Sequence, residues 1–135
     1  MGEEKKAKER IRELIALQKR LRESYGEDNY NVFVFGSYAT TSYDDERSDV
    51  DVAVYTPDME LYKQLSIEID DFFDKRRIPV DLFYIDTSLP APIYLAPLRA
   101  QIQFTDYFPK KLKLFEEKCD LELKRIKKKI DYEVR

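Results

Sequence analysis

The first third of the chain moves from a helical hydrophobic pattern to an extended one. Apolar side chains recur at intervals of three and four across residues 3–25, which predicts an amphipathic helix. The side chains expected on its buried stripe are Ala7, Ile11, Leu14, Ile15, Gln18 and Leu21. Asn31–Phe35 is β-branched and aromatic, and therefore predicts a strand. Gly36 breaks this strand, and Ser37 is expected to cap a short helix that reaches Thr41.

The next segment, Asp49–Tyr55, alternates strictly between two kinds of side chain. Because successive side chains of a strand point to opposite faces, this segment divides into two sets. The set expected to face the core consists of Val50, Val52 and Val54. The set expected on the other face consists of Asp49, Asp51 and Ala53. The pattern thus predicts two aspartates that project from the same face of a sheet.

The remainder of the chain predicts helices, one more strand and a loop. Residues 58–76 form a helix, and its expected buried face consists of Leu61, Leu65, Ile69, Phe72 and Phe73. Val80–Ile85 is a third apolar strand, and residues 86–97 form a loop that contains several prolines. A short helix is expected over Leu98–Ile102. A long final helix over about 109–132 repeats the apolar residues Leu112, Phe115, Cys119, Leu123, Ile126 and Ile130.

The order of these elements, α-β-α-β-α-β followed by a helix, predicts an α/β (α+β) fold with a small sheet covered by helices. A length of 135 residues predicts one domain, residues 1–135, that is large enough to bury a core. Hydrophobic residues make up 43% of the chain and charged residues 38%, as in folded soluble proteins. No apolar run approaches the length of a membrane span, so no membrane association is expected.

Charge and residue counts exclude several classes of function. The net charge is -3 and no basic patch dominates, so strong nucleic-acid binding by this chain alone is not expected. Cys119 is the only cysteine, which excludes an internal disulfide and fits a reducing cytoplasm. The chain has no histidine. Ser-His-Asp and Cys-His hydrolysis and His-ligated zinc are therefore excluded.

The strongest chemical signal is Gly36-Ser37, followed after eleven residues by Asp49-Val50-Asp51. A Gly-Ser turn after a strand offers backbone N–H groups to a phosphate, and a helix that starts there would add its positive end. A third acid, Asp81, lies in the next apolar strand. Together these residues predict a phosphate-binding turn beside carboxylates that could hold divalent metal. Such a combination is suited to nucleotidyl transfer.

A simpler interpretation of the acidic pair is the solvated face of an edge strand. Three observations favour a functional site instead. The Gly36-Ser37 turn lies upstream at the right distance to fold back over the acids. Asp49 and Asp51 stand at the start of a strongly apolar strand, although aspartate has poor β-propensity. Asp81 lies within another apolar strand, where an unpaired charge is expected to be costly. Metal coordination would offset the repulsion among the three carboxylates.

On these residues the chain resembles the nucleotidyltransferase superfamily that includes DNA polymerase β and kanamycin nucleotidyltransferase. It is most similar to the minimal nucleotidyltransferases (MNT proteins), antitoxins paired with HEPN-domain toxins. The shared signature is Gly-Ser, a spacer, Asp-x-Asp and a later Asp, and the resemblance covers about residues 10–105. It implies the nucleotidyltransferase fold, an αβαβαβ core with a small mixed sheet, here followed by the long C-terminal helix.

The resemblance also implies a mechanism. Asp49 and Asp51 would bind Mg²⁺ on ATP, and Asp81 would complete a second metal site and assist deprotonation of the attacking hydroxyl, so that two ions act together. Gly36 and Ser37 would hold the β- and γ-phosphates. The implied product is an AMP ester, formed in the cytoplasm on a tyrosine of a HEPN toxin.

One departure from the family pattern leaves alternatives open. Many relatives continue Gly-Ser-x-Ala-Arg-Gly, whereas this chain has Thr40-Thr41 in place of the arginine and second glycine. A non-catalytic binding module that neutralises its partner by complex formation is therefore a second hypothesis. A third is a nucleotidyltransferase subunit that acts on a small molecule or a nucleic acid. The acceptor and the oligomeric state, a homodimer included, stay open at this level.

Overall fold

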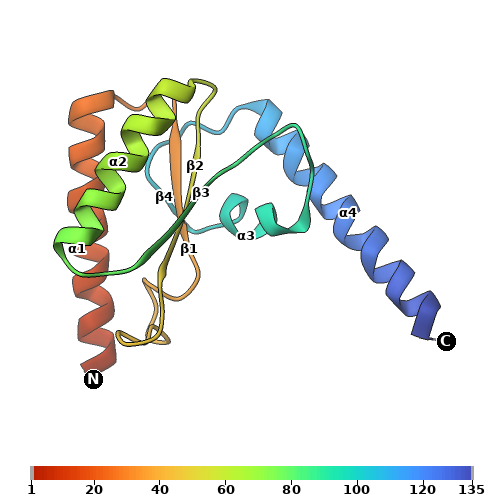
Figure 1. Ribbon diagram of the computed structural model, residues 1–135, viewed down its shortest axis with the longest axis horizontal. Helices are drawn as coiled ribbons and strands as arrows, with labels where there is room; N and C mark the ends of the chain where they lie inside the picture. Colours follow the sequence, from red (N-terminus) through yellow and green to blue (C-terminus); the bar gives the residue numbers. More distant parts are fainter. Residues whose placement is uncertain (1, 135) are drawn as a thin grey trace.

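Four strands form one mixed sheet: β1 (Asn31–Phe35), β2 (Val50–Tyr55), β3 (Val80–Tyr84) and β4 (Ile102–Gln103). The computed structural model describes residues 2–134. The strand order is β3-β2-β1-β4 (Figure 1). β1 pairs antiparallel with both β2 and β4, whereas β2 and β3 run parallel. The predicted small mixed sheet is therefore confirmed, with β1 and β2 at its centre.

Helices cover both faces of this sheet. They are α1 (Gly2–Tyr25), α2 (Met59–Lys75), α3 (Leu95–Leu98), which follows the 3-10 turn η1 (Pro92–Tyr94), and α4 (Lys110–Val134). In Figure 1, α1 and α2 lie side by side against one face, and α3 and the start of α4 lie on the other. Since β2 and β3 are parallel, α2 supplies the crossover connection that such a pair requires. The predicted α/β fold class is thus confirmed.

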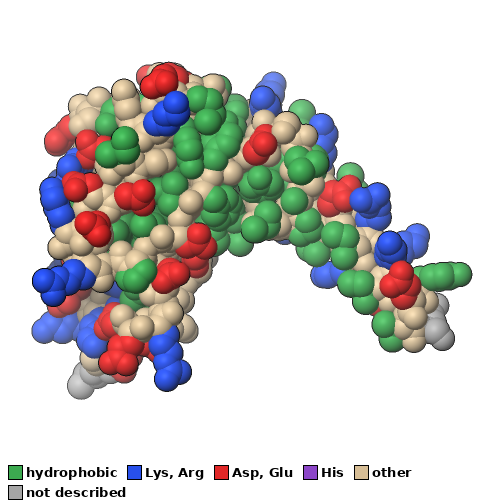
Figure 2. All heavy atoms as spheres, in the orientation of Figure 1, with side chains coloured by type: hydrophobic (Ala, Val, Ile, Leu, Met, Phe, Trp, Pro, Cys, Tyr) green, Lys and Arg blue, Asp and Glu red, His purple; other side chains and the backbone are tan. Residues whose placement is uncertain are grey.

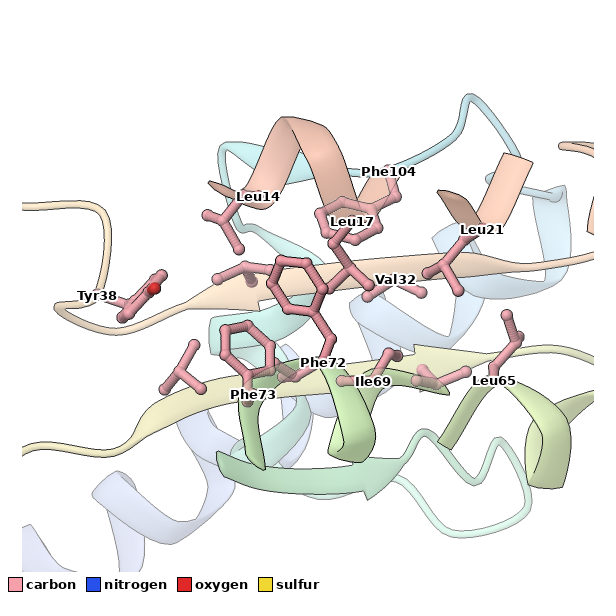
Figure 3. Packing of buried hydrophobic residues seen from close by; sticks show 14 of the residues in the cluster. Leu14, Leu17, Leu21, Val32, Tyr38, Leu65, Ile69, Phe72, Phe73 and Phe104 are labelled. Atoms are coloured by element: carbon pink, nitrogen blue, oxygen red, sulfur yellow. The ribbon is translucent and has the colours of Figure 1, made fainter. Parts of the chain in front are cut away.

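The larger core lies between the sheet and the pair α1 and α2. Figure 3 shows leucines of α1 facing the aliphatic and aromatic side chains of α2 across Val32 of β1. The β2 members of this core are Val50, Val52 and Val54. Ala53 points the other way, into a second cluster with Phe33 and Leu112. The predicted alternation of β2 is confirmed, although both of its faces are covered where the strand passes through the core.

The buried stripe of α1 differs from the prediction. Ile11 and Ile15 are 39% and 47% exposed, whereas Arg10 and Leu17 are buried. The residues that α1 buries are Ala7, Arg10, Leu14, Leu17 and Leu21. This set repeats strictly at three and four residues, so the helix is rotated toward Arg10 relative to the expected stripe. A buried arginine departs from the usual preference of charged side chains for solvent, so the apolar pattern alone does not include Arg10 in the stripe.

Two predicted short helices are wrong. Residues 36–42 form consecutive turns rather than a helix after Ser37. Because β1 and β2 are antiparallel neighbours, a loop suffices to join them, and the order begins α-β-β-α-β rather than α-β-α-β-α-β. The helix expected over Leu98–Ile102 ends at Leu98 instead. Ile102 is drawn into the sheet as the strand partner of Val34.

α4 leaves the body of the molecule along its second half. Leu112, Phe115 and Cys119 are buried against α3 and the sheet, as predicted. Ile126 and Ile130, on the same stripe, are 43% and 53% exposed. Figure 2 shows apolar side chains along the side of α4 that faces the hollow beside the body. Within residues 2–134, no helix combines the length and apolar character needed to cross a membrane.

Candidate active site

The three predicted aspartates gather where the parallel strands β2 and β3 begin. Asp51 and Asp81 are direct partners in the parallel register of these strands. Side chains at paired positions project from the same face, and neighbouring strands lie about 4.8 Å apart. Asp49 directly precedes β2, two residues before Asp51. The pairing therefore joins the Asp49-Val50-Asp51 motif to Asp81, although Asp51 and Asp81 are 30 positions apart in the sequence.

Gly36, directly after β1, lies next to this group of aspartates. Phe35, the last residue of β1, is the antiparallel partner of Asp51, so the chain turns at Gly36 beside the Asp51 carboxylate. Gly36 has a φ of 76°, which L side chains rarely adopt. A Cβ at this position would overlap Oδ2 of Asp51 and lie 3.2 Å from its Cγ. Only glycine allows the backbone to approach this carboxylate so closely.

The carboxyl of Asp51 has a raised pKa. Partial burial raises the pKa of its carboxyl, and the negative charges of Asp81 and Asp49 raise it further. Asp49 and Asp81 are themselves exposed to solvent. A cation placed among the three would relieve this repulsion and favour the ionised form of Asp51.

The environment of Asp81 differs from the sequence-based argument. β3 is an edge strand of the sheet and is only partly buried along its length. Asp81 is exposed, so the expectation of a charge at a costly buried position is wrong. The support for a role of Asp81 comes from its register with Asp51, which a sequence pattern does not specify.

The donor set fits a magnesium ion that is held together with a nucleotide. Mg²⁺ prefers oxygen ligands, and it commonly uses one or two carboxylates plus phosphate oxygens and water instead of a closed protein cage. Within residues 2–134, no three acidic or cysteine side chains are placed so that they could hold a metal ion by themselves. Asp49, Asp51 and Asp81 would thus supply carboxylate oxygens, and the remaining ligands would come from phosphate and water.

The turn after Gly36 is held by hydrogen bonds within the loop. The backbone N–H of Thr40 donates to the carbonyl of Ser37 over 2.9 Å, and the Thr40 hydroxyl donates to the same carbonyl over 2.7 Å. Thr40 Oγ1 also accepts from the N–H of Ser42. Thr40, noted in the sequence only as a departure from the family pattern, therefore closes the turn that contains Ser37.

Arg10 of α1 binds the loop after Gly36, a contact that the sequence analysis did not predict. Its Nε donates to the carbonyl of Tyr38, and its Nη2 donates to the carbonyl of Thr40 over 2.9 Å. The guanidinium also lies 4.8 Å from the centre of the Tyr43 ring. The signal was present in the sequence, because Arg10 falls on the strict three-and-four spacing of the α1 stripe.

A pocket of about 570 Å³ opens on the other side of Gly36. Its size falls within the range of small-molecule sites. The described residues that line it are Ile11, Val34, Phe35, Gly36, Ala39, Thr40, Ala96, Ala100, Gln101 and Ile102, and none of the three aspartates is among them. This lining is mostly apolar, whereas phosphate and metal require oxygen and N–H groups. The carboxylates and the turn, rather than this pocket, are therefore the better candidates for phosphate chemistry.

Comparison with known families agrees with this geometry. The family model of the nucleotidyltransferase domain matches residues 14–132. The chain belongs to the nucleotidyltransferase domain family, and the enzyme class predicted from the sequence is thereby confirmed. No protein of curated function matches the sequence.

Solved structures with the same fold come from toxin–antitoxin pairs. One is a mutant of the toxin–antitoxin MntA-HpeT, with a TM-score of 0.51 and 17% identity, covering 90% of this chain and 92% of that chain. Another is a toxin–antitoxin with AMP-PNP, with a TM-score of 0.51 and 19% identity, covering 91% of this chain and 94% of that chain. At this level of identity the similarity shows a shared fold.

Proposed function

We propose that this protein is a Mg²⁺-dependent nucleotidyltransferase that transfers AMP from ATP to a hydroxyl group. The single observation that carries the proposal is the meeting of Gly36, Asp51 and Asp81 at adjacent strand ends. A backbone turn without a Cβ next to paired carboxylates lets phosphate approach bound metal closely. The family match supports the reaction class, and the AMP-PNP in a structure of the same fold supports the choice of an adenine nucleotide.

Each residue then has a distinct role. Asp49 and Asp51 hold the metal that accompanies the triphosphate, and Gly36 and Ser37 bind the β- and γ-phosphates. Two Mg²⁺ ions bound there would offset the negative charge that develops on the attacking and leaving oxygens. Asp81, on the neighbouring strand, accepts the proton of the attacking hydroxyl. The hydroxyl oxygen forms a bond to the α-phosphorus, pyrophosphate leaves, and an AMP ester remains.

We further propose that the hydroxyl belongs to a tyrosine of a HEPN toxin partner. Support comes from the toxin–antitoxin structures that share the fold and from large apolar side chains that are exposed on this chain. Leu89 and Ile93, in the segment between β3 and α3, are 70% and 66% exposed. Ile126 and Ile130, in the second half of α4, are also exposed. Burial of such side chains against a partner would be favourable.

Isothermal titration with ATP tests the nucleotide site. Wild-type protein should bind ATP only with Mg²⁺, and Asp49→Asn/Asp51→Asn should lose most of this affinity. The control Asp28→Asn/Asp106→Asn removes two exposed carboxylates elsewhere on the chain and should bind normally. Unchanged ATP binding by Asp49→Asn/Asp51→Asn would remove the basis of the proposal.

A second candidate function is a binding module that neutralises the toxin through contact alone. The observation that favours it is the exposed apolar side of α4, which needs no chemistry to bind a partner. Labelled ATP distinguishes the two functions under single-turnover conditions. Transfer of labelled AMP to the toxin supports the enzyme, whereas suppression of toxicity without label supports the binding module.

A further inference from the structure

Arg10 contacts the loop after Gly36 at several points. Its two hydrogen bonds reach the carbonyls of Tyr38 and Thr40. Its Nη1 lies 3.6 Å from Oδ1 of Asp45. The guanidinium also packs near the rings of Tyr43 and Tyr38, with its Cζ 4.8 and 5.8 Å from the ring centres. One side chain of α1 therefore holds the loop from residue 38 to residue 45.

Neighbouring contacts hold the same segment against α1. Tyr38 is fully buried, and its hydroxyl donates to Oε2 of Glu13 over 3.1 Å. Lys6, one turn before Arg10, lies 3.4 Å from Asp45. Arg10 itself is only 8% exposed, so its charge is withdrawn from solvent and depends on these partners. Burial of a guanidinium without such partners would destabilise the fold, and these contacts offset that cost.

The two carbonyls that Arg10 binds determine where the next N–H groups point. In a trans peptide, the C=O of one residue and the N–H of the next point in opposite directions, and residues 2–134 contain no cis peptide bond. Because the carbonyls of Tyr38 and Thr40 point at Arg10, the N–H groups of Ala39 and Thr41 point away from the guanidinium. Arg10 thus aligns peptide dipoles in a turn where no helix is present to do so.

We propose that Arg10 is a positioning residue of the nucleotide site, which fixes the loop between Gly36 and Asp49 so that its N–H groups can receive the β- and γ-phosphates. This inference rests on the proposed function. The loop connects the proposed phosphate turn at one end with the proposed metal-binding aspartates at the other. The contacts of Arg10 with this loop therefore affect the position of both groups. Arg10 acts through the backbone of Tyr38 and Thr40 and has no contact with the reacting atoms.

The test compares Arg10→Lys with Arg20→Lys. Lysine keeps the charge but lacks the planar fork that serves two carbonyls at once. Arg20 is a matched control, because it also joins α1 to another element, through Glu68 at 3.0 Å and Asp71 at 3.7 Å, but makes these contacts with α2. Dissociation constants for ATP, ADP and AMP are measured with Mg²⁺ by isothermal titration.

Arg10→Lys should weaken the binding of ATP about tenfold, the equivalent of one lost hydrogen bond to a charged group. The binding of AMP should change little. The dependence on phosphate number is a readout that general destabilisation would not produce. Arg20→Lys should leave all three constants unchanged. Equal effects of the two variants, or equal weakening of ATP and AMP by Arg10→Lys, would overturn the proposal.

Hydrogen exchange of the nucleotide-free proteins separates this inference from the proposed function. Amides of residues 37–48 should exchange faster in Arg10→Lys than in Arg20→Lys, while those of β1 and β2 stay protected. If wild-type protein binds no ATP, the proposed function fails. The exchange data then test by themselves whether Arg10 stabilises the loop. Faster exchange confined to residues 37–48 supports this stabilisation, and equal exchange in both variants refutes it.

Discussion

The backbone of Gly36 lies so close to the carboxylate of Asp51 that a Cβ at position 36 would displace this carboxylate. This contact joins the end of β1 to the start of β2, since Phe35 and Asp51 are paired across the two strands. The same carboxylate is in register with Asp81 of β3. Asp51 is therefore the point where the Gly36 turn, the Asp49-Val50-Asp51 motif and the third acid meet.

Two glycines with the same backbone geometry allow this contact to be tested. Gly26 and Gly36 both have a φ of 76°, but a Cβ at Gly26 would meet nothing within 4 Å. Gly26→Ala and Gly36→Ala should therefore share a backbone cost of about 1 kcal/mol in the free energy of unfolding. Only Gly36→Ala should also displace the Asp51 carboxylate and weaken Mg²⁺-dependent ATP binding, by about tenfold or more. Denaturant unfolding and calorimetric titration measure the two effects, and normal ATP binding by Gly36→Ala would contradict the site.

Asp81 should matter more for transfer than for binding. It lies on a different strand from Asp49 and Asp51, and the proposed role assigns it to the attacking hydroxyl. A group used mainly in the transition state lowers turnover when removed and leaves ground-state binding nearly intact. Asp81→Asn should thus bind Mg²⁺-ATP like wild type, yet transfer labelled AMP about 100-fold more slowly, as for the loss of a general base. Asp86→Asn, an exposed acid after the same strand, is the control, and equal labelling by wild type and Asp81→Asn refutes this role.

A buried hydroxyl offers a test of the core. Tyr30 is fully buried, and its hydroxyl has no hydrogen-bond partner among residues 2–134. Tyr30→Phe should therefore leave the free energy of unfolding unchanged or raise it by about 1 kcal/mol. Tyr38→Phe is the matched variant, because it removes a hydroxyl that donates to Glu13, and it should lower stability by about 1–2 kcal/mol. Denaturant titration of both variants decides, and a large loss in Tyr30→Phe would reveal an unseen partner for that hydroxyl.

The same tyrosine predicts a pH dependence. Burial raises the pKa of Tyr30 to about 12 from its ordinary value of 10.0. Because the unfolded chain releases this proton at lower pH than the folded protein does, the contribution to stability is complete below pH 10 and is lost as the pH rises toward 12. Tyr30→Phe should flatten this part of the pH–stability curve. An identical curve for wild type and variant between pH 10 and 12 would disagree with this assignment.

The exposed side of α4 is predicted to bind the toxin. Ile126 and Ile130 are about one helical turn apart, so they share a face, while Lys128 lies on the opposite side. Ile126→Ser/Ile130→Ser should weaken toxin binding about tenfold or more, through lost apolar burial. Because both side chains are exposed in the free protein, the free energy of unfolding should change by less than about 1 kcal/mol. Lys128→Ser is the control for pull-down and titration, and unchanged toxin binding by the double variant would exclude this surface.

Much of the fold follows from local pattern. The three longest helices and the three longest strands appear near their predicted positions, because period and residue type act within each segment. The predictions that were wrong have physical causes too. The stripe of α1 includes Arg10, whose burial depends on carbonyls of a loop some 30 residues away in sequence. The helix predicted after Ser37 is replaced by turns whose carbonyls bind that same arginine.

The candidate site divides in the same way. Sequence alone was sufficient to indicate Gly36-Ser37, Asp49, Asp51 and Asp81 as a group, because spacing and residue chemistry are local properties. Tertiary structure decided which of them meet: the parallel register of β2 and β3 pairs Asp51 with Asp81, and the end of β1 brings Gly36 against Asp51. It also decided that Asp81 is exposed on an edge strand and that Arg10 holds the loop. Strand register and side-chain burial arise from contacts between distant segments, and the order of residues within one segment does not specify them.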